Sequence, residues 1–270
     1  MSAPDITTAT QLARLAGAPD TPLSVGVQTN DREAPGHALR AAFDYATSRS
    51  VGGFRRRGVI AATGALMLDA SAAAQGRHVM QDFETAATGV APPGFVFALT
   101  GGGPPPRWVI LEDASSPAGP RVLAETSRHR TDTRFPLAIL DGFEARDVAL
   151  AVRFRPVDGR VDQAAGLVVR YRDARNYYVV RANALENNVR LYRVVDGRRI
   201  QFAGTDARVP RDRWQTLALR AVGDRFDVSL DRHLLITAAD RTFAAAGRVG
   251  VWTKADSLTH FDALEAEALR

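Results

Sequence analysis

The chain contains no cysteine and only one lysine, Lys254, although lysine and arginine together number 35 of its 270 residues. The absence of cysteine excludes disulfide bonds and thiolate chemistry, and it is compatible with either the cytosol or an envelope compartment. The apolar run at 59–68 is too short to span a bilayer. Because Lys254 is the only lysine, the positive charge of the chain comes almost entirely from arginine.

Strong charge of one sign is also missing. The formal net charge is +5, and it is spread over the chain with no basic run beyond residues 55–57 and no nucleic-acid-reading motif. We therefore expect no nucleic-acid partner. The composition, 46% hydrophobic and 24% charged, is typical of a soluble globular protein with one large domain or two small ones.

The N-terminal quarter differs from the rest. Residues 55–75 read RRRGVIAATGALMLDASAAAQ, which has the order of a secretory signal: a basic cluster, an apolar run, and small residues ending in Ala-x-Ala. We expect 51–74 to be a signal-peptide-like segment cleaved after Ala74, with Val51 as the true initiator. A buried alanine-rich helix or a signal anchor is the alternative, because Asp69 interrupts the apolar region. Residues 1–50 would then be a non-native or disordered extension with at most one short helix, and the mature protein would be periplasmic or secreted with no membrane span.

From residue 80 onward, short alternating or apolar runs recur between Gly, Pro, Asp and Asn turns. Alternation with a period of two places neighbouring side chains on opposite faces of a strand, most clearly in GLVVRYRDARNYYVVRANALENNVRLY at 166–192. Asp196-Gly197 and Gly223-Asp224 are favourable hairpin turns. Many short strands with almost no helical periodicity predict an all-β sandwich or barrel. The predicted strands are 95–99, 108–112, 121–125, 137–140, 147–156, 165–172, 177–183, 188–194, 199–203, 214–222, 225–230, 233–238 and 247–253.

The order of these segments carries a resemblance. The segments DFE (82–84), GLVVRYRDARNYYVVRAN (166–183), VRLYRVVDGRR (189–199), DRWQTLALRAVGDRFDVSLD (212–231) and GRVGVWTKADSLTHFDAL (247–264) resemble the concanavalin A-like lectin/glucanase superfamily. Within it, the chain is most similar to secreted bacterial laminin-G-like domains and to the 3-keto-disaccharide hydrolase-type domain. The resemblance covers residues 80–270 and implies a jelly-roll sandwich of two antiparallel sheets, one of them concave and commonly the ligand-binding face.

The catalytic signature of the glucanase members is absent. They use paired carboxylates spaced Glu-x-Asp-x-x-Glu along one strand, and retaining hydrolysis needs two such groups close together. The nearest acidic groups here, Asp82 with Glu84 and Glu265 with Glu267, are expected to begin and close an edge strand. Histidines 129, 233 and 260 lack a nucleophile elbow or an ordered partner. The sequence thus favours binding over cleavage and leaves catalytic residues unknown.

The predicted binding face combines aromatic rings that stack on sugars with donors for hydroxyls or carboxylates. If Val168 and the residues on its face of the strand point into the core, the residues at the other alternate positions lie on the opposite face and expose arginine and tyrosine. On the next strand either Tyr177 or Tyr178 lies on that opposite face. Trp252 and Lys254 are two residues apart and therefore lie on the same face of the last predicted strand. If this face is exposed, Trp252 is a ligand contact, and otherwise it is a core residue. A solvated polar face remains the alternative for each position. The candidate ligand-binding residues are Arg170, Tyr178, Arg181, Arg190, Trp252 and Lys254.

Binding of this kind requires no cofactor. The superfamily resemblance implies a structural calcium, for which Asp82 and Asp262 could supply carboxylates. The first functional hypothesis is a secreted or periplasmic module that binds a carbohydrate or other polar polymer. The alternatives are a glycoside hydrolase of the 3-keto-disaccharide hydrolase type and a structural or adhesion module that contacts an envelope protein. Ligand identity and oligomeric state stay open.

Overall fold

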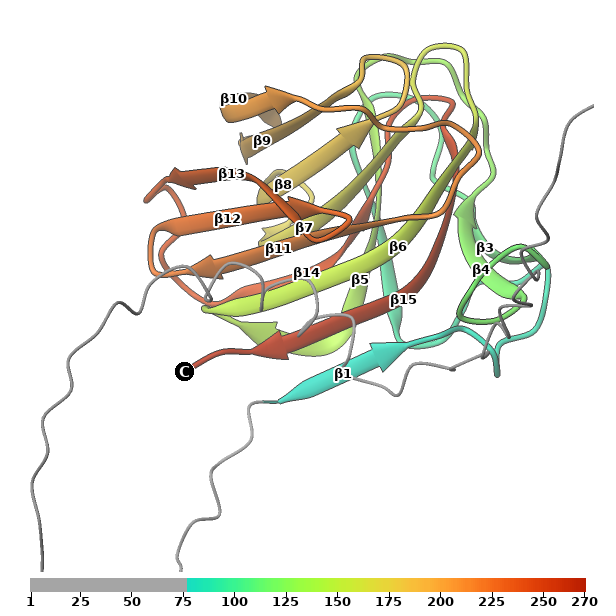
Figure 1. Cartoon of the computed structure of the whole chain (residues 1–270), viewed down its shortest axis with the longest axis horizontal. Coiled ribbons are helices and arrows are strands. Elements are labelled where there is room, and N and C mark those ends of the chain that lie inside the picture. The colour runs from blue at the N-terminus through green and yellow to red at the C-terminus, as the bar shows by residue number, and fades with distance from the viewer. Residues whose placement is uncertain (1–76) are drawn as a thin grey trace, which may run out of the picture. The chain divides into compact units, whose positions relative to one another are not determined.

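The computed structural model describes residues 77–270, and the signal-like segment and the extension before it lie outside the described residues. All regular structure in this part is β-strand, in two antiparallel sheets (Figure 1). No helix in the described residues has the length and apolarity to cross a membrane. The predicted all-β sandwich of two antiparallel sheets is therefore confirmed.

Sheet A contains the strands nearest the viewer in Figure 1. Its order is β13-β12-β11-β6-β15-β4-β3, with β1 paired to β15. The bounds are β13 (His233–Ala239), β12 (Arg225–Leu230), β11 (Gln215–Val222), β6 (Val148–Asp158), β15 (Leu258–Ala268), β4 (Arg121–Glu125), β3 (Trp108–Glu112) and β1 (His78–Gln81).

Sheet B lies behind it in the order β10-β9-β8-β7-β14-β5-β2. The bounds are β10 (Arg198–Asp206), β9 (Asn188–Val195), β8 (Asn176–Asn183), β7 (Ala164–Asp173), β14 (Gly247–Trp252), β5 (Arg134–Ala145) and β2 (Phe95–Gly101). Both predicted hairpin turns are confirmed. Asp196 and Gly197 have φ values of 50° and 80°, which suit a type I′ turn between β9 and β10.

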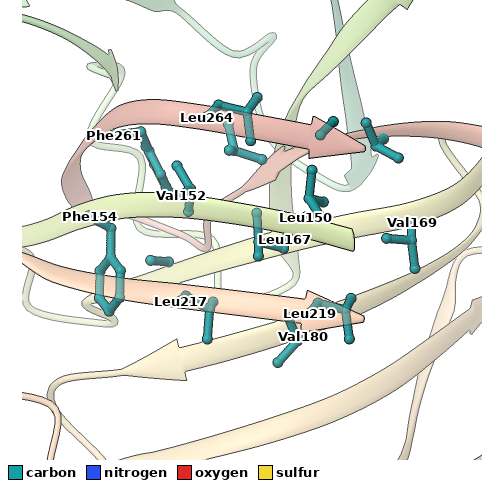
Figure 2. Packing of buried hydrophobic residues seen from close by; sticks show 14 of the residues in the cluster. Leu150, Val152, Phe154, Leu167, Val169, Val180, Leu217, Leu219, Phe261 and Leu264 are labelled. Carbon is teal, nitrogen blue, oxygen red and sulfur yellow. The ribbon is translucent and has the colours of Figure 1, made fainter. Parts of the chain in front are cut away.

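The main core fills the space between the two sheets. Side chains at alternate positions of β6, β7, β11 and β15 meet there (Figure 2), among them Leu150, Leu167, Leu217 and Phe261, all fully buried. Each contributes roughly 1.5–3 kcal/mol through burial of apolar surface. Leu167 and Val169 are the core residues of β7, so Val168 points to the other face of sheet B. The expectation that Val168 belongs to the main core is wrong, because the apolar run 166–169 has no polar position that marks its orientation.

Two strands were not predicted as such. β1 ends before Asp82, so the acidic group Asp82 and Glu84 follows a strand instead of beginning one. β15 carries Glu265 and Glu267 within its length and lies between β6 and β4, with β1 paired to its C-terminal half. Glu265 is fully buried, and His78 of β1 lies 2.8 Å from its Oε1. The C-terminal acidic group therefore lies in an interior strand of sheet A and not at its edge.

Candidate functional site

A second apolar cluster lies on the face of sheet B that points away from the main core. It takes the alternate positions of β5, β7, β8, β9 and β14 that the main core leaves out. Its members are Phe135, Leu137, Ile139, Ala164, Val168, Tyr171, Tyr177, Val179, Tyr192, Val194 and Trp252. All are buried, and Trp252 and Tyr177 have no exposed surface. Sheet B is thus packed on both of its faces.

Contacts between distant strands show that sheet B curves toward this cluster. The Thr100 hydroxyl on β2 lies 2.8 Å from the Tyr177 hydroxyl on β8, although β5, β14 and β7 lie between these strands. In a flat sheet, four strand spacings would separate them by about 19 Å, which these side chains cannot bridge. The face is therefore concave, and we call it the concave face.

Three aromatic rings of the concave face surround one guanidinium. The Arg199 guanidinium carbon, on edge strand β10, lies 4.5 Å from the Tyr192 ring centroid, 4.6 Å from that of Phe135 and 5.7 Å from that of Trp252. The Phe135 and Trp252 rings stack with centroids 5.4 Å apart. Such contacts between a cation and aromatic faces stabilise and orient the guanidinium. We call Phe135, Tyr192 and Trp252 the aromatic cage.

Charged groups gather where β8 ends and β14 has just ended. Arg181 donates to Glu186 Oε2 at 2.8 Å and to Asn188 Oδ1 at 2.6 Å. The Lys254 ammonium lies 2.8 Å from Asp162 Oδ2 and also bonds to Asp132. Each cation of this group is therefore matched by at least one carboxylate.

Burial and pairing set the titration of these groups. Burial raises the pKa of Asp162, and its bond to Lys254 only partly offsets this effect. For Glu186, burial opposes ionisation, but hydrogen bonds from Arg181 and Asn188 outweigh it and lower the pKa. Burial also opposes the charge of Lys254, yet hydrogen bonds to Asp132 and Asp162 leave its pKa raised. At neutral pH this end of the concave face is a polar, mostly compensated network.

Four of the six predicted binding residues lie on or beside the concave face. Trp252 belongs to its cluster, Arg181 follows Val179 on the same side of β8, and Lys254 follows Trp252 with the same parity. Arg190 pairs across the ladder with Arg181 and bonds to Asp206 at 2.7 Å. The structure brings these four together around one surface.

Arg170 and Tyr178 lie elsewhere, at the opposite end of the sandwich. Arg170 is fully buried and donates to three backbone carbonyls, those of residues 146, 223 and 243, at 3.1, 2.5 and 2.9 Å. Tyr178 packs in the main core, and its hydroxyl donates to Asp240 at 2.6 Å and accepts from the backbone of Phe243 at 3.0 Å. Burial raises the pKa of Tyr178 to about 12. Both side chains hold loops in place.

The six residues predicted from the sequence omit three members of the site, Arg199, Phe135 and Tyr192. A signal for Arg199 exists: the Asp196-Gly197 turn fixes the hairpin register, which pairs Arg199 with Val194 and places both on one face. No comparable local signal marks Phe135, because it reaches Arg199 only through the curvature of the whole sheet.

The calcium that the resemblance implies was assigned to Asp82 and Asp262, and both carboxylates have hydrogen-bond partners within the protein. Calcium takes six to eight oxygen ligands, and within residues 77–270 no group of three or more His, Asp or Glu side chains could hold a metal. Asp262 is buried and accepts from the Ser116 hydroxyl and the Ala263 amide, while Asp82 accepts from the Glu84 amide. The two predicted ligands have separate partners.

The histidine with the most ordered surroundings, His260, does not form a catalytic triad. Its Nδ1 lies 2.7 Å from Asp113 Oδ2, and the Ser115 hydroxyl donates to Asp113 Oδ1 at 2.6 Å. Asp113 also pairs with Arg155 at 2.7 Å. The carboxylate thus lies between serine and histidine, where nucleophile activation would need the histidine. This cluster ties β15 to β6 and to the loop after β3.

Comparisons with known proteins give structural neighbours only. No family model and no curated protein matches the sequence. Among solved structures, the carbohydrate binding module CBM66 from Bacillus subtilis is 21% identical, with 64% of this chain and 95% of that chain covered and a TM-score of 0.49. Domain 4 of AbnA, a GH43 extracellular arabinanase from Geobacillus stearothermophilus, is 11% identical over 72% and 93% of the two chains, with a TM-score of 0.48. The VIP36 exoplasmic/lumenal domain in a Ca²⁺/Man3GlcNAc-bound form is 14% identical over 66% and 84%, with a TM-score of 0.45.

Proposed function

We propose that this protein is a glycan-binding module that holds a saccharide on the concave face of sheet B. One observation carries the proposal: the curvature of sheet B joins an aromatic cage to a row of polar groups on a single surface. Aromatic rings stack on the C–H faces of sugars, and guanidinium, ammonium and amide groups bond to sugar oxygens. The residues proposed to contact the ligand are Arg181, Arg190 and Lys254, joined now by Tyr192 and Arg199, while Trp252, which has no exposed surface, is proposed to support Arg199 from beneath.

The role proposed for Arg170 and Tyr178 changes accordingly. Their polar atoms already have protein partners, three backbone carbonyls for Arg170 and Asp240 with Phe243 for Tyr178. Both side chains also lie at the end of the sandwich opposite the charged end of the concave face, so they do not belong to the proposed ligand surface. We therefore assign both to the support of the sandwich.

The binding test is a glycan array followed by calorimetry on the array hits, with the full chain, Arg181→Ala and Arg220→Ala. Arg181 lies beside the aromatic cage, whereas Arg220 points outward from β11 on sheet A and is a control of the same residue type. Losing a charged hydrogen bond costs about 1.5–3 kcal/mol, so Arg181→Ala should weaken binding roughly 10- to 100-fold. Arg220→Ala should bind like the wild type. Equal affinity of all three proteins would place the ligand elsewhere, and no hit at all, with a protein partner recovered instead, would favour the adhesion role.

A second candidate function is glycoside cleavage, suggested by two carboxylates at the polar end of the concave face. The pKa of Asp162 is raised and that of Glu186 is lowered, and two carboxyl groups whose pKa values are shifted in opposite directions are what acid and base roles require. Incubation of the full chain with 3-keto-glucosides tests this. Sugar release that Asp162→Asn abolishes would support a hydrolase, and absence of turnover with retained binding would support the module alone.

We also propose that the mature protein is exported, on the signal-like order of residues 55–74. N-terminal sequencing of the protein from the producing cells checks this. A mature chain beginning at Gln75 is expected, and a chain that keeps residues before Gln75 would contradict the proposal.

A further inference from the structure

Arg199 differs from the other cations of the concave face because it has no acidic partner. Arg181 pairs with Glu186, Arg190 with Asp206, and Lys254 with Asp132 and Asp162. Within residues 77–270 no carboxylate or hydrogen-bond acceptor pairs with Arg199, and its buried Nη1 has no partner. A charge that is largely removed from water and left unpaired is costly. Its position therefore needs an explanation.

The aromatic cage explains the orientation of Arg199 but does not satisfy its hydrogen bonds. Rings at 4.5 and 4.6 Å contact the guanidinium, and a ring lying against a guanidinium satisfies its charge in part but accepts none of its in-plane N–H bonds. The side chain is also partly exposed, at an edge strand. The rings hold the guanidinium in one direction, and a ligand that approaches the exposed part of the side chain would meet its N–H groups, whereas Nη1 is buried.

Arg181 contributes one more unpaired donor. Its Nε is buried without a hydrogen-bond partner, on the same side of β8 as Val179 of the concave face. The Arg181 guanidinium carbon lies 5.7 Å from the Tyr192 ring, so two guanidiniums approach the same ring. Burial and the charge of Arg181 lower the pKa of Arg199, and the charge of Asp162 acts in the opposite direction. The surface therefore offers N–H groups, and Arg199 is the cation on it that no carboxylate pairs with directly.

These features select the charge of the ligand. A cationic ligand would have to expel Arg199 from the aromatic cage and would then meet Arg181. A neutral sugar could use the donors but would leave the charge of Arg199 uncompensated. A carboxylate can accept two parallel N–H bonds from one guanidinium and neutralise it at the same time.

We propose that the glycan held on the concave face is acidic, and that Arg199 binds a sugar carboxylate such as that of a uronic acid. This inference rests on the proposed glycan-binding function and adds the substrate class. Arg199 is then the residue that discriminates charged from neutral saccharides, and the aromatic cage fixes its direction.

The test compares oligouronates with their own methyl esters, because esterification removes the charge and keeps the sugar. Oligogalacturonate, oligoglucuronate and oligomannuronate, each as free acid and as ester, are titrated into the full chain by calorimetry, next to neutral oligosaccharides. At least one free acid should bind roughly 10- to 100-fold more tightly than its ester, the ratio expected for one charged hydrogen-bonded pair. This comparison needs no variant.

Two substitutions on the same strand then locate the effect. Arg199→Gln removes the charge and shortens the side chain while keeping two amide N–H donors, and it should abolish the preference for the acid. Arg198→Gln is the matched control, since Arg198 is the exposed neighbour with opposite parity on β10. It should keep the preference.

The outcomes separate the two proposals. If neutral sugars or esters bind as tightly as the acids, the acidic preference is wrong and glycan binding stands. If acids bind preferentially but Arg198→Gln and Arg199→Gln behave alike, the assignment to Arg199 is wrong. If no saccharide of either kind binds, the proposed function fails together with this inference.

Discussion

Asp262 provides a direct test of how burial controls stability in this fold. Its carboxylate has no exposed surface, and its two hydrogen bonds come from the Ser116 hydroxyl and the Ala263 amide. Burial, reinforced by the nearby charge of Glu84, raises the pKa of Asp262 from 3.8 to about 6. The folded state therefore binds a proton more tightly than the unfolded state. The stabilising contribution of this group is complete below about pH 3.8 and is lost as the pH rises through about 6.

Asparagine at this position should remove that loss. A pKa raised from 3.8 to about 6 corresponds to about 3 kcal/mol of unfolding free energy at neutral pH. About 2 kcal/mol of this loss of unfolding free energy should occur between pH 4.5 and 7.5. The amide is close in shape to the protonated acid, and its oxygen can still accept from the Ala263 amide. Asp262→Asn should therefore be more stable than the wild type at pH 7.5 and gain less at pH 4.5.

Urea unfolding of both proteins at half-unit steps from pH 4.5 to 7.5 measures this difference. Glu144→Gln is the control for loss of a carboxyl group, because Glu144 is exposed on β5. A difference between Asp262→Asn and wild type that is constant with pH, or that grows toward acid, would refute the account of Asp262 as a carboxyl held largely neutral by burial.

Two further predictions concern packing and hydrogen bonding, and urea unfolding measures both. Gly250→Ala should lower the free energy of unfolding by about 1–3 kcal/mol or more, because the added Cβ would lie 2.2 Å from the Ala138 carbonyl oxygen. Gly102→Ala is the control, since the nearest atom to its added Cβ is 3.8 Å away, and it should not destabilise the protein. Equal effects would show that β14 can move away from β5. Tyr178→Phe should lower the free energy of unfolding by about 1–3 kcal/mol, because Asp240 loses one of its hydrogen-bond donors. Tyr171→Phe is the control, since this buried ring has a hydroxyl that makes no such bond, and it should be nearly neutral. A neutral Tyr178→Phe would contradict the role of Tyr178 in holding its loop.

The fold was predictable because its signals are local. Alternation and turn residues located thirteen of the strands, and the register of the β9–β10 hairpin follows from a two-residue turn. The last strand, β15, was not predicted because its polar residues do not mark an exposed face. His260, Asp262 and Glu265 are all buried, and the strand bulges between Asp262 and Glu265. A period-two pattern cannot describe a strand whose register shifts within its length.

The candidate site was predictable only in part, and Arg170 shows why. By alternation from Val168 it belongs on the concave face, but its φ of 51° and the register shift between Val169 and Asp173 turn it toward backbone carbonyls at the end of the sandwich. Tyr171 then takes the place on the concave face. One bulged residue thus exchanges two side chains between a ligand surface and a structural role, and a sequence pattern does not mark which residue is bulged.

The aromatic cage reflects a different limit, since it depends on the curvature of the sheet. Arg199 and Phe135 lie on strands that are five positions apart in sheet B, and their contact at 4.6 Å requires the strands between them to bend together. Local sequence specifies which face each side chain takes, but the distance across the face is set by the accumulated twist and coil of the whole sheet. Residues such as Arg181 and Trp252 could therefore be assigned to a common face from their alternate positions in the sequence. The surroundings of the Arg199 guanidinium, from which we infer the charge of the ligand, depend instead on the curvature of the whole sheet.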